Sequence, residues 1–206
     1  MKVREANADD AEFMAQVVLE AEATGSEITS YRKMFDLPKA QLIAAFSNGL
    51  KNSPPGHALS LHNFFIVEVN GKPAAGLSAY IEGSNGDSSH LTTAFLMQVI
   101  PRNILSAGFR LLRDNSEVSL AKTTNTLQID CVATIPDYRG KGCLKLLLQS
   151  VLEQARQQHV KVAEIQVWTQ NTSAIKAYEA LGFVISREAK SDKFPGNGKL
   201  VMTKSI

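Results

Sequence analysis

A short loop containing two glycines is the part of this sequence best suited to chemistry. It lies between a predicted strand and a predicted helix and reads Arg139-Gly140-Lys141-Gly142-Cys143-Leu144. Glycines let the backbone turn its N–H groups toward a ligand, and free amides at the positive end of a helix favour phosphate oxygens. The side chains of Arg139 and Lys141 add positive charge beside these amides. We interpret the loop as a candidate phosphate-binding site, with a tight turn that only leads into a packed helix as the alternative.

The spacing of other residues excludes the common nucleotide and metal sites. A Walker loop requires GxxxxGK[ST], which Leu144 and Lys145 do not provide, and a dinucleotide GxGxxG loop would need glycine in place of Lys145. The two cysteines, Cys131 and Cys143, form no CxxC pair, so we expect packing residues rather than metal ligands or nucleophiles. No metal-ligand spacing connects the histidines, which are His57, His62, His90 and His159. The sequence therefore predicts no metal site.

The elements that must position this loop begin with two predicted helices. Residues 9–23 start with acidic side chains and carry apolar side chains at the spacing of one helical face. A second helix is predicted to start after Pro38 and to run through residues 39–50 until Gly49 and the breaker Ser53-Pro54-Pro55-Gly56. The residue pattern thus predicts a chain that opens with helices. Two β-rich runs, FFIVEV and AAGLSAYIE, then flank an Asn70-Gly71 turn and predict a hairpin.

The second half of the chain reads as strands alternating with helices. Residues 91–113 are predicted to form one or two short helices, interrupted before Pro101. A strand (LQIDCVAT), the glycine loop, a helix and a second strand (VAEIQVW) follow. A short helix closed by Gly182 and two further strand-like runs complete the chain. The fold class is therefore α/β, with a mixed sheet, a helical insertion and no internal repeat.

The composition is that of an ordinary folded protein. The chain has 206 residues, 44% hydrophobic and 20% charged, with 22 Lys+Arg against 20 Asp+Glu and a formal net charge of +2. This balance excludes intrinsic disorder and a polybasic arm, and it argues against a nucleic-acid partner. The length favours a single domain over residues 1–206. Few cysteines, no signal-like start and no long apolar run indicate a soluble cytoplasmic protein with no membrane partner.

Two motifs in the second half resemble those of the GNAT superfamily of acyl-CoA-dependent N-acyltransferases. The glycine loop is similar to the pyrophosphate-binding pattern R/Q-x-x-G-x-G/A at Arg139 and Gly142, and residues 171–183 are similar to N-x-x-A-x-x-x-Y-x-x-x-G-F at every named position. The resemblance covers residues 127–190, which we expect to form the cofactor-binding core. The loop departs from the pattern at Leu144, where a small residue is usual, and we expect this side chain to point into the helix packing.

The resemblance implies a mostly antiparallel sheet with helices on both faces and a V-shaped splay between the fourth and fifth core strands. It implies that acetyl-CoA binds in this splay as a co-substrate, without a metal. By position, the backbone of Val132, Ala133 and Thr134 would hold the pantetheine arm, and the backbone of residues 139–144 would hold the pyrophosphate. Asn171 would contact the cofactor and cap its helix. A backbone N–H near Val132 would stabilise the oxyanion of the reaction.

The resemblance also implies an amine acceptor, and two residues are candidates for moving protons. Asp130 lies two residues before Val132, so strand alternation predicts one face for both. We consider Asp130 as the base, with a solvated or salt-bridged carboxylate as the alternative. Tyr178 has the position of the tyrosine that returns a proton to the departing thiolate, with an aromatic packing residue as the alternative. Cys131 has the opposite strand parity, which predicts a buried apolar position. Weaker candidates for the base are Glu20, Glu27 and Glu82.

The identity of the acceptor is not predicted by these motifs. In the family, the acceptor is usually held by segments that correspond here to residues 24–36 and 191–198. The insertion at 91–113 would either roof the acceptor cleft or form a homodimer surface, and we favour the roof. Trp168 is expected in the core, with the acceptor site as the alternative. We expect an N-acetyltransferase that acts on a primary amine of a small molecule, or of a protein or peptide, by direct attack in a ternary complex. The alternative is a catalytically silent acyl-CoA-binding regulatory domain.

Overall fold

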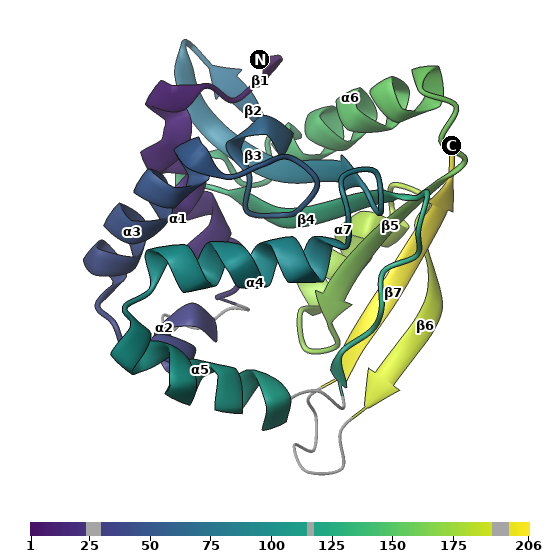
Figure 1. Cartoon of the computed structure of the whole chain (residues 1–206). Coiled ribbons are helices and arrows are strands. Elements are labelled where there is room, and N and C mark those ends of the chain that lie inside the picture. The colour runs from purple at the N-terminus through teal and green to yellow at the C-terminus, as the bar shows by residue number, and fades with distance from the viewer. Residues whose placement is uncertain (24–29, 115–117, 191–197) are drawn as a thin grey trace.

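The computed structural model describes residues 1–23, 30–114, 118–190 and 198–206, and within these ranges seven strands form one sheet (Figure 1). The strands lie in the order β1-β2-β3-β4-β5-β7-β6, and β4 and β5 form a parallel pair while the other neighbours are antiparallel. The strands are β1 (Lys2–Glu5), β2 (Phe64–Val69), β3 (Lys72–Ile81), β4 (Leu127–Thr134), β5 (Val162–Trp168), β6 (Val184–Lys190) and β7 (Gly198–Ser205). The predicted mixed, mostly antiparallel sheet is confirmed.

Strands β4 and β5 separate along their length, which opens the sheet. Their pairing ends at Ile129 on β4 and Ile165 on β5. Beyond this point β4 continues to Thr134 beside β3, and β5 continues to Trp168 beside β7. The two strands therefore diverge from Asp130 onward, which confirms the predicted V-shaped splay.

Helices cover both faces of the sheet, as predicted. The helix α6 (Cys143–Gln157) packs on one face and buries Leu147, Leu148 and Val151 in what we call the α6 core, which α7 (Thr172–Glu179) extends. The helices α1 (Ala11–Ala21) and α3 (Lys39–Asn52) pack on the other face in what we call the α1 core (Figure 1). The short helix α2 (Ser30–Phe35) joins the α1 core through Phe35. None of the helices in the described ranges is long and apolar enough to cross a membrane.

The predicted helical opening is wrong for the first residues of the chain. Strand β1 pairs with β2, and a 3-10 turn at Ala8–Asp10 leads into α1. The Arg4 guanidinium donates to both carboxylate oxygens of Asp10 at 2.7 and 2.8 Å and to Glu68 on β2 at 2.7 Å. Hydrogen bonds from Arg4 hold the pKa of Asp10 below its usual value. Because Val3 is the single large apolar residue of this strand, its sequence has no alternation to detect.

The helix α3 ends at Asn52, directly before the Ser53-Pro54-Pro55-Gly56 segment that was predicted to end it. Gly49 lies inside the helix and allows a close approach of α4, where an added Cβ would collide with Phe95 and Val99. The hairpin turn behaves as predicted: Asn70 and Gly71 have φ values of 51° and 74°, which match the twist of the flanking strands.

The helical insertion between β3 and β4 packs against the α1 core. It consists of α4 (Ser88–Val99) and α5 (Arg102–Asp114), and Pro101 separates them as predicted. Asp87 caps α4 by accepting the N–H groups of Ser89 and His90 at 2.9 and 3.1 Å. Phe95 and Leu105 are buried in the α1 core. The insertion therefore lies on the face opposite α6, and its function as a roof stays a prediction.

The chain returns from the insertion to β4 through residues 119–125, which we call the strap. The strap runs beside the C-terminal strands (Figure 1) and is fixed to them by side chains. Gln166 of β5 donates to the Leu120 carbonyl at 2.9 Å, and Arg187 of β6 donates to the Ala121 carbonyl at 2.8 Å. The Thr123 hydroxyl donates to Glu164 of β5 at 2.8 Å. The strap is thus held in one position across the sheet face opposite α6.

Candidate active site

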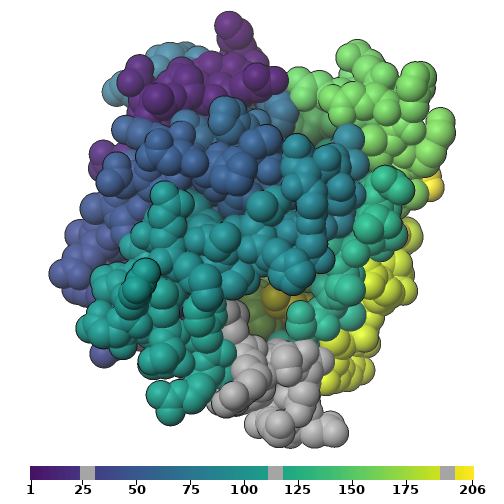
Figure 2. All heavy atoms as spheres, in the orientation of Figure 1, coloured from purple at the N-terminus to yellow at the C-terminus, as the bar shows by residue number. Residues whose placement is uncertain are grey.

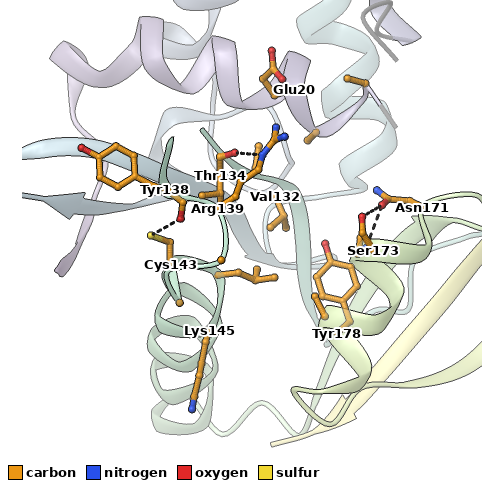
Figure 3. A pocket seen from close by; sticks show the side chains of 18 of the residues that line it. Glu20, Val132, Thr134, Tyr138, Arg139, Cys143, Lys145, Asn171, Ser173 and Tyr178 are labelled. Carbon is orange, nitrogen blue, oxygen red and sulfur yellow. Dashed lines mark hydrogen bonds between the residues drawn. The ribbon is translucent and has the colours of Figure 1, made fainter. Parts of the chain in front are cut away.

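A large cavity opens where β4 and β5 diverge. It has a volume of about 1120 Å³ and lies between β4, the start of α6, α7 and the end of α1 (Figure 3). The predicted site residues that line it are Val132, Ala133, Thr134, Arg139, Gly140, Gly142, Cys143, Leu144, Asn171 and Tyr178. In the described part of the chain, Lys141 and Asp130 are the two predicted site residues that do not line it. The structure therefore brings both motifs to one cavity.

The loop before α6 leaves backbone N–H groups open to this cavity. Gly140 and Gly142 have φ values of 71° and 84°, and an added Cβ at either position would meet no protein atom within 4 Å. No side chain caps α6. Within the described residues, Leu146 is the first residue of this turn whose N–H has a backbone acceptor, the Gly142 carbonyl at 3.1 Å. The amides of residues 143–145 are therefore available to an anion.

The side chains of the loop take different directions. The Arg139 Nε donates back to the Thr134 carbonyl at 3.1 Å (Figure 3). The Lys141 Nζ lies 5.3 Å from the centre of the Tyr138 ring, beside the cavity rather than in its lining. Leu144 packs against the α6 core, as expected, although it also lines the cavity. In this loop the backbone amides therefore face the cavity more directly than the charged side chains do.

A β-bulge in β4 decides which way the neighbouring side chains face. Cys131 has a φ of 52°, and the register between β3 and β4 shifts at this point. The extra residue reverses the alternation, so Val132 packs toward the α6 core while Cys131 packs toward the α1 core. The expected common face of Asp130 and Val132 is therefore wrong. Burial raises the pKa of the Cys131 thiol, which keeps it protonated and agrees with a packing residue.

Asp130 is held by two neighbours on the face opposite α6. The Tyr80 hydroxyl donates to Asp130 Oδ2 at 2.9 Å, and the ammonium of Lys122, on the strap, donates to the same oxygen. Burial alone would raise the pKa of Asp130, but the Lys122 charge and the two hydrogen bonds outweigh it and hold the pKa below its usual value. Asp130 is therefore a paired, ionised carboxylate at neutral pH.

Asn171 and Tyr178 come from the two ends of α7. Asn171 Oδ1 accepts the Ala174 N–H at 3.2 Å and the Ser173 hydroxyl at 3.1 Å, which confirms the predicted helix cap (Figure 3). Tyr178 is buried and packs on Phe183 with a ring-centre distance of 6.2 Å. Its hydroxyl points into the cavity (Figure 3). Burial raises the pKa of Tyr178, so the phenol stays protonated at neutral pH.

Helices α1 to α3 contribute cavity residues that the sequence analysis did not assign to the cofactor. Glu20, Arg32 and Lys39 line the cavity, and Lys39 is paired with Glu20 at 2.6 Å. Glu20, a weaker candidate for the base, is thus engaged in an ion pair. No local motif marks these residues, because they reach the cavity through the packing of separate helices on the sheet.

The remaining candidates lie outside the cavity or outside the described residues. Glu82 is buried below the insertion and accepts the Ser88 N–H at 3.0 Å. Trp168 is half-buried, with Lys199 Nζ 4.6 Å from its ring centre. Glu27 and the rest of residues 24–29 and 191–197 fall outside the described ranges. No group of three His, Cys, Asp or Glu side chains in those ranges could hold a metal.

The cavity fits a ligand that combines an anionic group with an extended polar arm. The uncapped amides of α6 suit a pyrophosphate. Beyond Ile129, the β4 edge that faces β5 has no strand partner, so its backbone groups can pair with amides of an arm that runs along it. These two features lie side by side in the same cavity, which is the arrangement that acetyl-CoA requires.

Comparisons with known proteins agree with this geometry. The profile of the Acetyltransferase (GNAT) family matches residues 33–183. An N-acetyltransferase from Staphylococcus aureus Mu50 shares the fold with 20% identity and a TM-score of 0.73, covering 99% of this chain and 100% of that chain. A second acetyltransferase does so with 16% identity and a TM-score of 0.69, covering 100% of both chains. The protein yncA from Salmonella typhimurium, solved with its cofactor acetyl-CoA, has 14% identity and a TM-score of 0.54, covering 99% of this chain and 92% of that chain. A comparison with curated proteins gives no match.

Proposed function

The chain belongs to the GNAT acetyltransferase family, and we propose that it is an N-acetyltransferase that transfers an acetyl group from acetyl-CoA to a primary amine by direct attack in a ternary complex. The acceptor is the amine of a small molecule, or of a protein or peptide. The observation that carries the proposal is the uncapped start of α6, which opens into the cavity at the splay of β4 and β5. Acetyl-CoA is the co-substrate of this family, and it supplies the acetyl group as a thioester.

The backbone of the chain does most of the cofactor binding in this proposal. The amides of residues 143–145, which follow Gly142, bind the pyrophosphate, and Arg139 and Lys141 add charge around it. Val132, Ala133 and Thr134 offer the unpaired edge of β4 to the pantetheine arm. Because a chain with a net charge of +2 has no strong overall field, the attraction for a polyanionic cofactor is local.

The reaction requires the acceptor to lose a proton and the thiolate to gain one. A lysine-like amine with a pKa near 10.4 is only about one part in 2500 neutral at pH 7. The amine nitrogen attacks the carbonyl carbon, the C–S bond breaks, and a backbone N–H near Val132 stabilises the oxyanion. Tyr178 stays protonated and points into the cavity, so it can return a proton to the departing sulfur.

Asp130 faces the acceptor in this proposal rather than the cofactor. Its charge at neutral pH suits the binding of an ammonium. Its lowered pKa makes it a weak base, so the amine loses its proton to bulk solvent through waters beside the carboxylate before the nitrogen attacks. Among the described residues that line the cavity, Glu20 is the one carboxylate, and it is paired with Lys39.

Cofactor binding and turnover are tested separately. Acetyl-CoA should raise the melting temperature of the protein, whereas ATP and NAD at the same concentration should not. No shift at millimolar acetyl-CoA would exclude the proposal. Acetyl-CoA consumption is then measured over a panel of small amines and amine-bearing peptides, with CoA release as the readout. Binding without turnover on any member of a broad panel would favour the alternative, a catalytically silent acyl-CoA-binding regulatory domain.

A further inference from the structure

The side chains around Asp130 form a cluster that the reaction described above does not yet use. We call Asp130, Lys122 and Tyr80 the Asp130 cluster. Lys122 Nζ also donates to the Tyr80 hydroxyl, so each member contacts the other two. Every hydrogen bond to the Asp130 side chain among the described residues ends on Oδ2, and Oδ1 has none. The Asp130 side chain is 22% exposed, which leaves Oδ1 open to a further partner.

We propose that Lys122 and Tyr80 are positioning residues that hold Asp130 through Oδ2, so that Oδ1 receives the ammonium group of the acceptor. The inference rests on the proposed function, because it assigns the acceptor side of the same reaction. It adds a subsite for a primary ammonium, built by the strap, that neither motif of the sequence contains.

The position of the cluster in the fold supports an acceptor subsite. Asp130 directly follows the last residue of β4 that pairs with β5, so it lies where the splay begins. Its charge is one cause of the raised pKa of Tyr178, which places the two side chains within electrostatic reach. An amine bound at Oδ1 therefore lies at the splay of β4 and β5, on the sheet face opposite α6. Tyr178, which is proposed to protonate the sulfur, is within electrostatic reach of this position.

The surface leaves this side of the molecule accessible. Figure 2 shows a hollow below α4 and beside the strap, with yellow and green atoms of the C-terminal strands at its bottom. The insertion, the strap and the strands β5 and β7 surround this hollow.

The strap is built to keep Lys122 in place. The neighbours Ala121 and Thr123 are fixed by Arg187 and Glu164, and Glu164 is 1% exposed. These contacts fix the backbone on both sides of Lys122, so the strap sets the position from which its ammonium reaches Asp130.

The Lys122 charge also affects how readily an ammonium bound at Asp130 loses its proton. An isolated carboxylate would raise the pKa of a bound ammonium and oppose its deprotonation. A second cation on the same carboxylate lowers that pKa again, so the amine is oriented without being held in its protonated form. Other titratable groups face Asp130 or its partners from the surrounding elements: Tyr31, His57, Glu82, Cys131, Tyr178 and Lys199, with Glu22 facing Tyr31 and Cys131.

The first test measures the Asp130 carboxyl directly by carbon NMR titration of the protein without substrates. In the wild type the carboxyl should stay ionised down to acidic pH, because Lys122 and Tyr80 outweigh burial. In Lys122→Met only the Tyr80 hydrogen bond and the Lys199 charge still oppose burial, so the carboxyl pKa should rise by about one unit or more. Lys122→Arg, which keeps the charge, should stay close to the wild type. An unchanged titration in Lys122→Met would overturn the proposal.

The second test measures ammonium binding and turnover. Adding n-propylammonium as a probe at neutral pH should shift the Asp130 carboxyl resonance in the wild type, and the absence of a shift would overturn the subsite. With the best acceptor of the amine panel, Asp130→Asn should raise the KM for the amine about tenfold or more while the KM for acetyl-CoA stays unchanged. In Lys122→Met the acidic limb of the pH profile of kcat/KM should move to higher pH.

Controls separate this proposal from the proposed function. Lys190→Met removes a lysine whose carboxylate partner, Glu188, lies on the exposed edge strand β6, and it should change neither titration nor KM. If acetyl-CoA stabilises every variant and the wild type acetylates amines, an unchanged amine KM in Asp130→Asn overturns the subsite alone. If the wild type acetylates no amine, the proposed function fails, and the response of Asp130 to n-propylammonium still decides whether the subsite exists.

Discussion

At the scale of single residues, burial sets the protonation of the side chains that matter most. Burial raises the pKa of the Tyr178 phenol and the Cys131 thiol further above neutral, whereas Lys122 holds the pKa of the partly buried Asp130 carboxyl below its usual value. A raised pKa of a phenol or thiol needs only a low-dielectric environment, whereas a lowered pKa of a partly buried carboxyl needs a partner of opposite charge. Which partner is present depends on tertiary contacts rather than on residue type.

The substitution Tyr178→Phe tests the general acid. It removes the hydroxyl that points into the cavity but keeps the ring that packs on Phe183. We expect kcat for the best amine of the panel to fall about 100-fold, within the range for loss of one acid, with acetyl-CoA stabilisation retained. Tyr138→Phe, which removes a hydroxyl from another tyrosine of the cavity wall, is the matched control and should retain turnover. Full turnover in Tyr178→Phe would show that another group protonates the sulfur.

The buried His57 gives a pH dependence of stability. Burial lowers its pKa from 6.5 to about 4, so the folded protein holds the neutral imidazole beside Ser53. Below pH 6.5 the histidine of the unfolded chain takes up a proton that the folded protein does not bind until about pH 4. The stability of the folded state is therefore full above pH 6.5 and falls as the pH drops from 6.5 toward 4. The shift corresponds to about 3 kcal/mol.

Urea unfolding of His57→Gln at pH 7 and pH 4 measures this contribution. The variant should lose less unfolding free energy than the wild type between the two pH values. His62→Gln, at an exposed histidine, should behave like the wild type. Equal pH dependence in the wild type and His57→Gln would contradict the assignment.

At the scale of elements, the start of α6 and the bulge of β4 are the two local structures that make the cavity. Both depend on positive φ values, at Gly140 and Gly142 in the loop and at Cys131 in the strand. The two glycines make the positive φ values of the loop predictable from the sequence, because a positive φ favours glycine. Cys131 gives no such signal, which is why the face of Asp130 was predicted wrongly.

The glycine pair Gly142 and Gly71 provides a test with a matched control. Both have positive φ values, 84° and 74°, and an added Cβ at either would meet no protein atom. Alanine at each position should therefore cost a similar free energy of unfolding, about 1 kcal/mol. Only Gly142→Ala should also weaken acetyl-CoA stabilisation, because its methyl group enters the space of the pyrophosphate. Equal acetyl-CoA shifts in Gly142→Ala and Gly71→Ala would contradict this account of the loop.

At the scale of the whole molecule, the strap ties the helical insertion to the far half of the sheet. Its contacts join residues more than 40 positions apart, such as Gln166 with Leu120 and Arg187 with Ala121. The insertion packs on the α1 core, while the strap is bound to β5 and β6. The two sides of the splay are therefore connected on the face opposite α6.

The substitution Arg187→Met tests this connection. It removes the ion pair at 3.0 Å with Glu164, whose side chain is 1% exposed, and it releases the Ala121 carbonyl. We expect a loss of about 2 kcal/mol in urea unfolding, below the usual cost of breaking a buried pair because Arg187 is partly exposed. Lys190→Met, which removes an exposed pair on the same strand, should change stability by less than about 1 kcal/mol. Similar losses of unfolding free energy in both variants would show that the contacts between Arg187 and the strap do not stabilise the fold.

Much of the fold and the cofactor side of the site could be predicted from the sequence. The loop around Gly142, the cap at Asn171 and the hairpin at Asn70-Gly71 are each specified by a few adjacent residues, because backbone conformation there depends on local sterics and hydrogen bonds. The strand–loop–helix order then places these features at one end of the sheet.

The acceptor side was decided by tertiary structure. The short strand around Val3 forms because β2 is there to pair with it, and the bulge at Cys131 turns Asp130 away from Val132. Lys122 reaches Asp130 because the strap is fixed to distant strands, and Glu20 meets Lys39 because two helices pack on the sheet. The sequence by itself determined the cofactor loop, the helix cap and the order of the elements, since each is encoded by neighbours along the chain. The partners of the charged side chains were decided by the tertiary structure alone, since those contacts exist only between segments that folding brings together.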